Sequence, residues 1–439
     1  MKKTKLKVLF ISNELIGSGL IHRLIREGHG VKLYIKDPAR KKCLTGFVKK
    51  TRSWRNELKW VGKKGLIIFD DVGFGQIQDD LRTEGYTVFG GTVEGDKLEL
   101  DRALGQRILH NHKIKILPSF NFRNIDSAID FVKENKGKWV VKQNSHVSSL
   151  NHVGEQADGS DVIEALHILK KQDVDYAHLQ KKVDGIEVGI ARYFNGHDWV
   201  GPIEINHEYK RMLNGDVGPL TAEMGTVMWH STDESLKLFE CTLRKITPYL
   251  QKIGYKGDID VNCIVTKDQI WPLEFTPRLG SPSTQLQCAL YDSSMADFIY
   301  AVAKGKRVNL KCKKQFGIVV SIAVPPFPYP PKAGQKPRMT AKDRIISFTR
   351  TLSTEDECSV CFEEVSKRKN KRGEEEMFWA GTYGYVAFIA TYADTIPKAK
   401  KKAMKLVTAL NVPHSFHRTD IGDRVHKHDL PMLKKWGWV

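Results

Sequence analysis

Short apolar strands alternate with helix-forming stretches over the first ninety residues, and this alternation constrains the fold more than any other feature of the sequence. The apolar runs are Lys7–Ile11, Val31–Ile35, Leu66–Phe69 and Thr87–Phe89. Such a series is typical of an open parallel sheet with helices on its faces. The loop 12–19 then lies at the carboxyl end of the first strand, where open α/β sheets bind ligands. Because this loop lacks a full G-x-G-x-x-G pattern, the sequence does not favour a dinucleotide site.

Pairs of strands follow in the middle of the chain. The pattern predicts one hairpin from His178–Val183 and Glu187–Phe194, turning at Asp184-Gly185. It predicts a second hairpin from Ile259–Val265 and Ile270–Phe275.

The last third of the chain predicts a smaller region of strands and one long helix. Gly317–Val324 and Gly384–Ala390 are apolar strands, and a basic helix is predicted over 396–410. The proline-rich stretch 325–337 favours an extended connection over a helix. A polar, helix-forming stretch is also expected earlier, over 96–111.

Composition limits the class of protein. A chain of 439 residues, 41% of them hydrophobic, suggests roughly three domains of about 150 residues and excludes global disorder. Seven Cys do not suggest a disulfide framework, and no apolar run approaches the roughly 18 residues of a membrane span, so a cytoplasmic protein without a membrane partner is expected. The net charge of +19 predicts acidic partners, with nucleotides, phosphorylated metabolites and nucleic acid all left open.

Two carboxylates in the second hairpin are candidates for a metal site. Asp260 and Glu274 each stand between apolar residues on strands predicted to pair. Carboxylates that face one another across such strands repel unless a cation lies between them, and Mg²⁺ bridging nucleotide phosphates is a natural occupant. The alternative is that both are ordinary solvent-facing strand residues.

Lys142 and Glu187 are weaker candidates when taken singly. Lys142 ends a short strand, where an ammonium group could neutralise phosphate oxygens, and Glu187 follows a turn, where a carboxylate could accept from ribose hydroxyls. A lysine on a half-buried strand more commonly extends to water.

Several short motifs in a fixed order resemble the ATP-grasp enzymes, and within them the phosphoribosylamine–glycine ligase family. The resemblance covers about residues 5–425. The motifs that carry it are Gly90-Gly91-Thr92, Asp184-Gly185-x-Glu187, Tyr209-Lys210-Arg211, Gly218-Pro219-x-Thr221, Leu273-Glu274-Phe275-x-x-Arg278 and Arg418-x-Asp420-Ile421-Gly422-x-Arg424.

This resemblance implies an α/β fold of the ATP-grasp type in three parts. The first, residues 1–92, is the amino-terminal open parallel α/β sheet domain on the substrate side. The second, residues 93–310, is the ATP-grasp region with a lid at about 120–190. The third, residues 311–439, is a small carboxy-terminal α/β domain.

The resemblance also implies an activity and its residues. The reaction would join glycine to phosphoribosylamine with ATP and Mg²⁺ or Mn²⁺, through an acyl phosphate, giving glycinamide ribonucleotide, ADP and phosphate. Small molecules, an amino acid and a phosphorylated amine, would be the partners. The implied catalytic residues are Lys210, Arg211 and Arg278; the implied nucleotide-binding residues are Arg102, Lys142, Gln180, Lys181 and Glu187; the implied metal ligands are Asp260, Glu274 and Thr276.

The sequence departs from the family at several of these points. The lid loop 144–152 has neither the family's lysine nor its glycines, which leaves His146 or His152 as a phosphate contact or as surface residues. Thr276 replaces a metal-binding Asn, and the family's ribose-phosphate signature is absent from the loop 12–19, with Asp70-Asp71 replacing a Gly-Pro-Glu. Two alternatives follow: a ligase for a different phosphorylated or nucleic-acid-linked amine, or a non-catalytic nucleotide-binding homologue. The sequence leaves the oligomeric state open.

Overall fold

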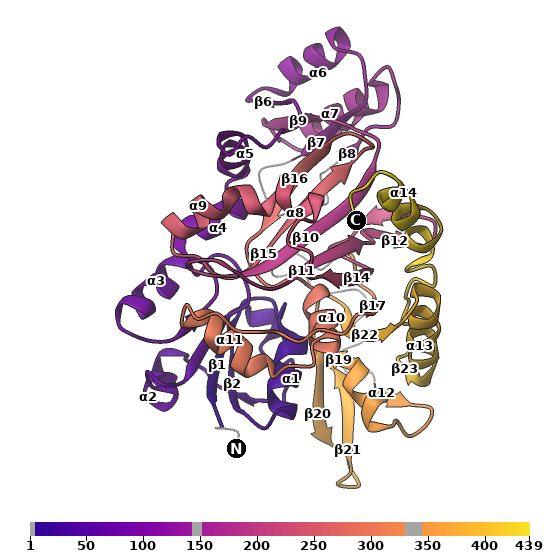
Figure 1. Cartoon of the computed structure of the whole chain (residues 1–439). Coiled ribbons are helices and arrows are strands. Elements are labelled where there is room, and N and C mark those ends of the chain that lie inside the picture. Colours follow the sequence, from indigo (N-terminus) through magenta and orange to yellow (C-terminus); the bar gives the residue numbers. More distant parts are fainter. Residues whose placement is uncertain (1–4, 143–151, 330–344) are drawn as a thin grey trace.

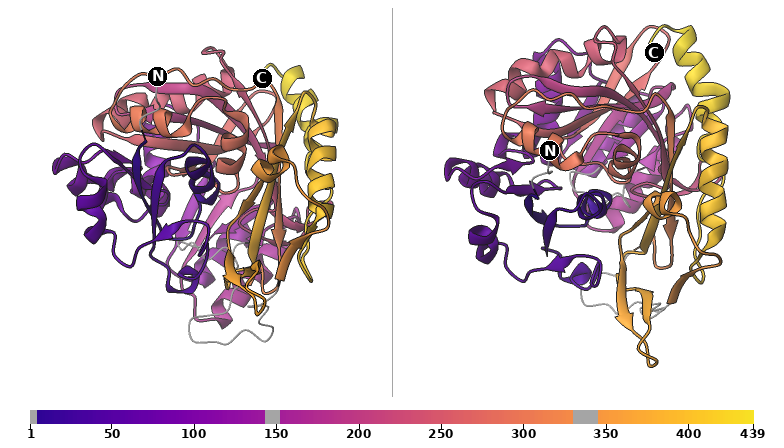
Figure 2. Two further views of the ribbon diagram at one scale, coloured as in Figure 1. Left: turned by 90° about the horizontal axis from the view of Figure 1, so that it is seen from below. Right: turned by 60° about the horizontal axis from the view of Figure 1, so that its bottom comes forward.

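The structure is a computed structural model of the chain, and it describes residues 5–142, 152–329 and 345–439. A large central sheet connects the other parts of the molecule (Figure 1). The amino-terminal sheet lies at one end of it and a small sheet with two helices at the other, while the last helices run along one side (Figures 1 and 2).

The amino-terminal sheet has five parallel strands in the order β3-β2-β1-β4-β5, which confirms the predicted open parallel sheet. Its central strand is buried on both faces: Val8 and Phe10 pack with one layer, whereas Leu9 and Ile11 pack with the other. The elements are β1 (Lys7–Ser12), α1 (Ser18–Arg26), β2 (Gly30–Ile35), β3 (Lys49–Lys50), α2 (Leu58–Val61), β4 (Leu66–Phe69), α3 (Gly75–Thr83) and β5 (Val88–Phe89).

The central sheet has eight antiparallel strands in the order β16-β15-β10-β11-β14-β17-β22-β19. The apolar side chains of β10, β11 and β15 pack on one face, with buried residues of the segment 236–250. Its strands are β10 (Ile186–Asn195), β11 (Trp199–Glu208), β14 (Gly225–Ser231), β15 (Lys256–Val265), β16 (Ile270–Thr276), β17 (Phe316–Ala323), β19 (Val360–Phe362) and β22 (Tyr385–Ala393).

Helices join and cover these two sheets. They are α4 (Val93–Leu100), α5 (Arg102–Asn111), α8 (Lys237–Cys241), α9 (Thr247–Lys252), α10 (Ser283–Leu290) and α11 (Met295–Ala303). The single helical stretch predicted over 96–111 is in fact two helices. The break comes at Asp101, which leaves helical geometry and accepts a hydrogen bond from the Leu104 amide at 3.0 Å, so it caps the second helix.

A small sheet of order β6-β9-β7-β8 lies at the top of Figure 1. Its apolar face packs against two helices around Val132, Trp139 and Leu166. The elements are β6 (Ser119–Phe122), α6 (Ile125–Glu134), β7 (Trp139–Lys142), β8 (His152–Val153), α7 (Ser160–Lys171) and β9 (Ala177–Lys181). They fall within the region predicted to be a lid, and its closing motion stays a prediction.

The predicted hairpin at Asp184-Gly185 is wrong. β9 pairs with β6 and β7 in the small sheet, whereas β10 pairs with β11 and β15 in the central sheet. Local turn chemistry suggested a hairpin, but the connection crosses between two sheets: β9 pairs with the short strands β6 and β7, whereas β10 pairs over its full length with β15. The second predicted hairpin is confirmed as β15–β16.

The carboxy-terminal part completes the central sheet and adds a four-stranded sheet of order β20-β21-β18-β23. The helix predicted over 396–410 is α13, which buries Ile396, Ala399 and Ala403 against β17 and β22. The elements are β12 (Arg211–Leu213), β13 (Val217–Leu220), β18 (Ile345–Phe348), α12 (Thr354–Ser359), β20 (Val365–Lys369), β21 (Glu375–Trp379), α13 (Ile396–Ala409), β23 (Leu410–Asn411) and α14 (Leu430–Lys435).

The predicted boundary near residue 310 falls inside a continuous sheet, because β17, β19 and β22 extend the sheet begun by β10 and β11. The three-part division therefore stays a prediction about folding units. Across the described ranges, no helix combines the length and the apolar character that crossing a membrane requires.

Arg418 ties the carboxy-terminal segment to the β12–β13 hairpin. Its guanidinium is buried, donates to Asp216 and Asp420 at 2.7 Å each, and lies over the ring of Tyr209. We expect Arg418→Met to lower the free energy of unfolding by about 2–4 kcal/mol, because two partly buried carboxylates each lose one of their partners. Urea unfolding followed by circular dichroism measures this change.

Arg307→Met is the matched control. Arg307 also donates to an aspartate, Asp198, at 2.7 Å, but its side chain is 83% exposed. Its loss should change the free energy of unfolding by about 0.5 kcal/mol or less. Equal losses in the two variants would contradict the structural role assigned to Arg418.

Candidate functional site

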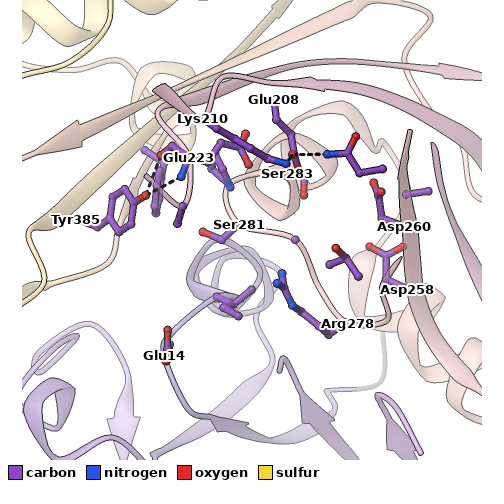
Figure 3. A pocket seen from close by; sticks show the side chains of 18 of the residues that line it. Glu14, Glu208, Lys210, Glu223, Asp258, Asp260, Arg278, Ser281, Ser283 and Tyr385 are labelled. Atoms are coloured by element: carbon purple, nitrogen blue, oxygen red, sulfur yellow. Dashed lines mark hydrogen bonds and ion pairs between the residues drawn. The ribbon is translucent and has the colours of Figure 1, made fainter. Parts of the chain in front are cut away.

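The central sheet carries polar side chains on the face opposite its apolar core. On β15 they are Asp258, Asp260 and Asn262, and on β11 they are Glu204, Asn206 and Glu208. Alternate residues of a strand point to the same face, so these six side chains project together. Several of them surround a cavity with a volume of about 270 Å³ (Figure 3).

The two carboxylates predicted to face one another are not cross-strand partners. Asn262 is opposite Glu274, and Thr276 is opposite Asp260. A β-bulge between Asn262 and Cys263 shifts the pairing by one residue, and the sequence pattern does not reveal this shift. Asp260 and Glu274 therefore sit diagonally on one face and line the same cavity.

Asp260 is held by a polar network rather than by a cation. Its Oδ2 accepts from Asn206 Nδ2 at 2.7 Å, and the same amide donates to Glu204 at 3.0 Å. Burial, with Glu208 nearby, raises the pKa of Asp260 well above its usual range. The neighbouring strand makes room for Asn206 with a glycine, since a Cβ at Gly189 would lie 2.1 Å from Asn206 Oδ1.

Lys210 lies among three carboxylates. Its Nζ is 2.9 Å from Glu187 Oε1 and from Glu208 Oε2, and 3.8 Å from Glu274 Oε1. Burial opposes the charge of this ammonium group, but the carboxylates outweigh it and raise the pKa of Lys210 well above its usual value. The predicted catalytic lysine is therefore a fixed cation in the centre of the site.

Glu274 is the carboxylate around which the cations gather. Arg102, at the start of α5, approaches Glu274 Oε2 at 3.2 Å. Although desolvation opposes ionisation, Lys210, Lys142 and Arg102 hold the pKa of Glu274 down to about 2. Glu274 thus stays ionised through the physiological range, as a ligand for a divalent cation must.

The small sheet contributes Lys142 and Gln180. Lys142 Nζ donates to Gln180 Oε1 at 2.7 Å. Burial and the nearby Arg102 lower the pKa of Lys142 to about 7. The Lys142 and Gln180 side chains lie on the face of the small sheet opposite α6 and α7. A bound anion there would offset the repulsion between Lys142 and Arg102.

Lys181 and Arg211 do not join the charged side chains around Glu274. Lys181 lies on the other face of the small sheet, with its ammonium 4.7 Å from the centre of the Trp139 ring. Arg211 donates to the carbonyl of Gly218 at 2.8 Å and holds the β12–β13 hairpin together. Their side chains thus have structural contacts where the sequence predicted nucleotide and catalytic roles.

Arg278 extends into the cavity and pairs with Glu99 at 3.0 Å (Figure 3). Although burial disfavours its charge, Glu99 and Asp71 raise the pKa of this guanidinium above its usual value. A fixed guanidinium at the cavity wall could bind a carboxylate or a phosphate in bidentate geometry.

A divalent cation fits Glu274 and Asn262 better than Glu274 and Asp260. Asn262 Nδ2 donates to Glu187 and Glu208 at 2.8 and 3.0 Å, which leaves its buried Oδ1 without a partner. In residues 5–142, 152–329 and 345–439, no three His, Cys, Asp or Glu side chains are grouped to hold a metal by themselves. Mg²⁺ needs no such group, since it commonly takes one or two carboxylates with substrate phosphate oxygens.

The predicted lid contacts are only partly covered by the structure. His146 lies outside the described residues. His152 lies in β8, with Nε2 3.5 Å from Asp161 on α7 and thus on the helix side of the small sheet. The residues missed by sequence reasoning are Asn262, Glu208, Glu223 and Asp258, although the alternation Glu204-x-Asn206-x-Glu208 in an apolar strand was a usable signal.

The amino-acid sequence of the chain is similar to those of known proteins. Residues 101–284 match the phosphoribosylglycinamide synthetase, ATP-grasp (A) domain. The chain is 24% identical over 392 residues to phosphoribosylamine–glycine ligase of Streptococcus pneumoniae, covering 85% of this chain and 86% of that protein. It is 21% identical over 389 residues to the same-named protein of Pyrococcus abyssi, covering 86% and 82%.

Solved structures show the same fold. The crystal structure of phosphoribosylamine–glycine ligase from Thermotoga maritima superposes with a TM-score of 0.70 at 18% identity, covering 95% of this chain and 100% of that one. A biotin carboxylase from Campylobacter jejuni, solved as a β-γ-ATP complex, gives a TM-score of 0.61 at 12% identity, with 98% and 97% covered.

Residues 101–284 match an ATP-grasp domain, and the fold of the whole chain is that of the ATP-grasp structures above. The chain resembles phosphoribosylamine–glycine ligase at low sequence identity. The resemblance predicted from the sequence motifs is confirmed.

The lowered pKa of Lys142 can be measured directly. With lysines dimethylated by ¹³C-formaldehyde, one NMR signal should titrate near pH 7, and Lys142→Arg should remove it. Arg102→Met should move that signal upward in pH, because Arg102 is the neighbouring charge that most lowers this pKa. A Lys142 signal that titrates near 10 in both proteins would contradict the proximity of the two cations.

Proposed function

We propose that the protein is an ATP-dependent carboxylate–amine ligase. The γ-phosphoryl group of ATP passes to a carboxylate to give an acyl phosphate and ADP, and an amine then displaces phosphate to form an amide. The observation that carries this proposal is the cluster of Lys142, Arg102 and Lys210 around the ionised Glu274. Two anions can meet only where such fixed positive charge offsets their repulsion.

The first step uses the groups nearest to Glu274. Lys142 and Arg102 neutralise phosphate oxygens, and the free oxygen of Glu187 accepts from ribose hydroxyls. Glu274 and Asn262 would hold Mg²⁺, which when bound supplies further positive charge to the phosphates. Arg278 orients the substrate carboxylate for attack on the γ-phosphorus.

The second step needs a neutral amine beside the acyl carbon. The nitrogen forms the new C–N bond, the bond from carbon to the phosphate oxygen breaks, and the amine proton passes to a carboxylate of the cavity. Water must be excluded because an acyl phosphate hydrolyses, and closure of the region 120–190 would exclude it.

The amine acceptor could be phosphoribosylamine or a different amine. The relatives are named as ligases of phosphoribosylamine and glycine, so this substrate pair is the first to be tested. The altered loop 12–19 and Asp70-Asp71 favour a different amine. A nucleic-acid-linked amine predicts binding to DNA or RNA that weakens steeply with salt.

Hydroxylamine tests the ligase chemistry without regard to the natural acceptor. With ATP, Mg²⁺, glycine and hydroxylamine, the protein should form glycine hydroxamate and ADP in equal amounts. We expect Glu274→Gln to lower this rate by about 100-fold, because the cations lose their central counter-charge and the metal loses a ligand. Coupled assay of ADP and colorimetric assay of the hydroxamate measure both products.

Glu134→Gln is the control, since Glu134 is an exposed carboxylate at the end of α6. It should leave the rate unchanged. A protein that makes no hydroxamate or ADP with glycine or with any other α-amino acid would support the non-catalytic alternative.

A further inference from the structure

The cavity beside Glu274 is lined by many carboxyl groups, although the chain as a whole carries a charge of +19. Among its described lining residues, carboxylates outnumber cationic side chains by eight to three. They come from the amino-terminal loop, the central sheet, the connection before β14 and the segment after β19, so the tertiary fold brings them together (Figure 3). An acidic wall of this kind favours positively charged ligands.

The three cations that line the cavity are already paired. Arg40 donates to Glu363 at 2.8 Å, Arg278 donates to Glu99 at 3.0 Å, and Lys210 is bound by Glu187 and Glu208. A phosphorylated acceptor would have to break one of these pairs to find a partner. The lining side chains therefore offer it no unpaired cation.

A carboxylate already occupies the start of α1, the place where an open α/β sheet can bind phosphate. Asp70 is fully buried, and its Oδ2 accepts from the Gly17 amide and from Ser12 Oγ at 2.8 Å each. Asp71 stands next to it, and burial together with the neighbouring charge of Asp71 raises the pKa of Asp70 to about 7. An incoming phosphate would meet like charge here.

Some of the cavity's acceptor oxygens have no partner. Glu223 and Asp258 are only 5% and 4% exposed, and Glu223 Oε1 and Asp258 Oδ1 accept no hydrogen bond from any residue that the structure describes. Burial and the nearby Glu208 outweigh the opposing charge of Lys210 and raise the pKa of Glu223 well above its usual range, so a bound cation would favour the ionised form of this carboxyl group. Buried polar atoms at a cavity wall are normally satisfied, so these oxygens point to a ligand that donates hydrogen bonds.

The ligand suited to this wall is an organic cation. In the described ranges no three metal-binding side chains converge on one point, so the carboxylates are spread around the cavity. Separated acceptors match the separated N–H groups of an extended molecule. A volume of about 270 Å³ suits a small one.

We propose that the acceptor taken by this cavity is an amine with at least one further positive charge, a diamine, polyamine or guanidino amine, held by Glu223 and Asp258. This inference rests on the proposed ligase chemistry and departs from it only in the acceptor. One amino group, once neutral, attacks the acyl phosphate, releases phosphate and gives its proton to a cavity carboxylate. The second charged group stays bound to the acidic wall and positions the first.

The test compares acceptors at fixed ATP, Mg²⁺ and amino acid donor. Putrescine, agmatine and spermidine are measured against propylamine and phosphoribosylamine, with hydroxylamine as the reference nucleophile. We expect at least one of the three cationic amines to exceed propylamine in kcat/KM by about tenfold or more. Mass spectrometry should identify its amide with the donor.

Two variants locate the effect. Glu223→Gln and, independently, Asp258→Asn should each lower the ratio of diamine turnover to hydroxylamine turnover by about tenfold. The control Glu134→Gln should have the same ratio as the unaltered protein. Because the acceptor panel uses the unaltered protein, it decides the question even where a variant fails to fold.

The outcomes separate this inference from the proposed function. Absence of hydroxamate would overturn both. Hydroxamate formation without preference for a cationic amine, or with preference for phosphoribosylamine, would overturn only the acceptor inference. Displacement of the diamine by Mg²⁺ alone would make the cavity a metal site, and hydroxamate formation only with lysine or arginine as donor would assign the acidic wall to the donor; either result overturns the proposal.

Discussion

The pairing register of the central sheet is the constraint on which the site depends. In β10, β11, β15 and β16, alternate side chains enter the apolar core and the rest face the cavity. A slip by one residue in any of these strands would bury carboxylates in the core and expose its apolar residues to water. The packing of the core therefore determines which polar side chains lie next to one another. Asn262 opposite Glu274 is the direct result.

Charge balance then divides the polar face into two parts. Around Glu274, fixed cations from α5, β7 and the connection between β11 and β12 hold a carboxylate ionised. Elsewhere on the cavity wall, Asp258 and Glu223 form no ion pair among the described residues, and burial raises their pKa values, that of Asp258 to about 8. One part suits phosphates and a divalent ion, and the other suits a positively charged molecule. A ligase that joins an anionic donor to a cationic amine needs both parts side by side.

Much of the fold could be predicted because its signals are local. The apolar runs of the amino-terminal sheet and the β15–β16 hairpin follow from sequence pattern alone, and Glu274, Lys210 and Arg278 follow from ordered motifs. The turn at Asp184-Gly185 misled because local turn chemistry does not reveal whether the two flanking strands pair with each other or with strands of different sheets. The prediction that Asp260 faces Glu274 was wrong for a related reason, because a β-bulge shifts the strand register and no distinctive residue type marks it in the sequence.

The sequence by itself determined which segments are strands, which face of each strand is apolar, and which motifs resemble the ATP-grasp superfamily, because these depend on residues close together in the chain. The tertiary structure alone decided which charges meet. Arg40 reaches Glu363 across 323 positions and Arg102 reaches Glu274 across 172. Coulombic energies depend on distance and burial, which appear only when the sheets have packed. The acidic character of one cavity in a basic protein is for that reason a property of the fold.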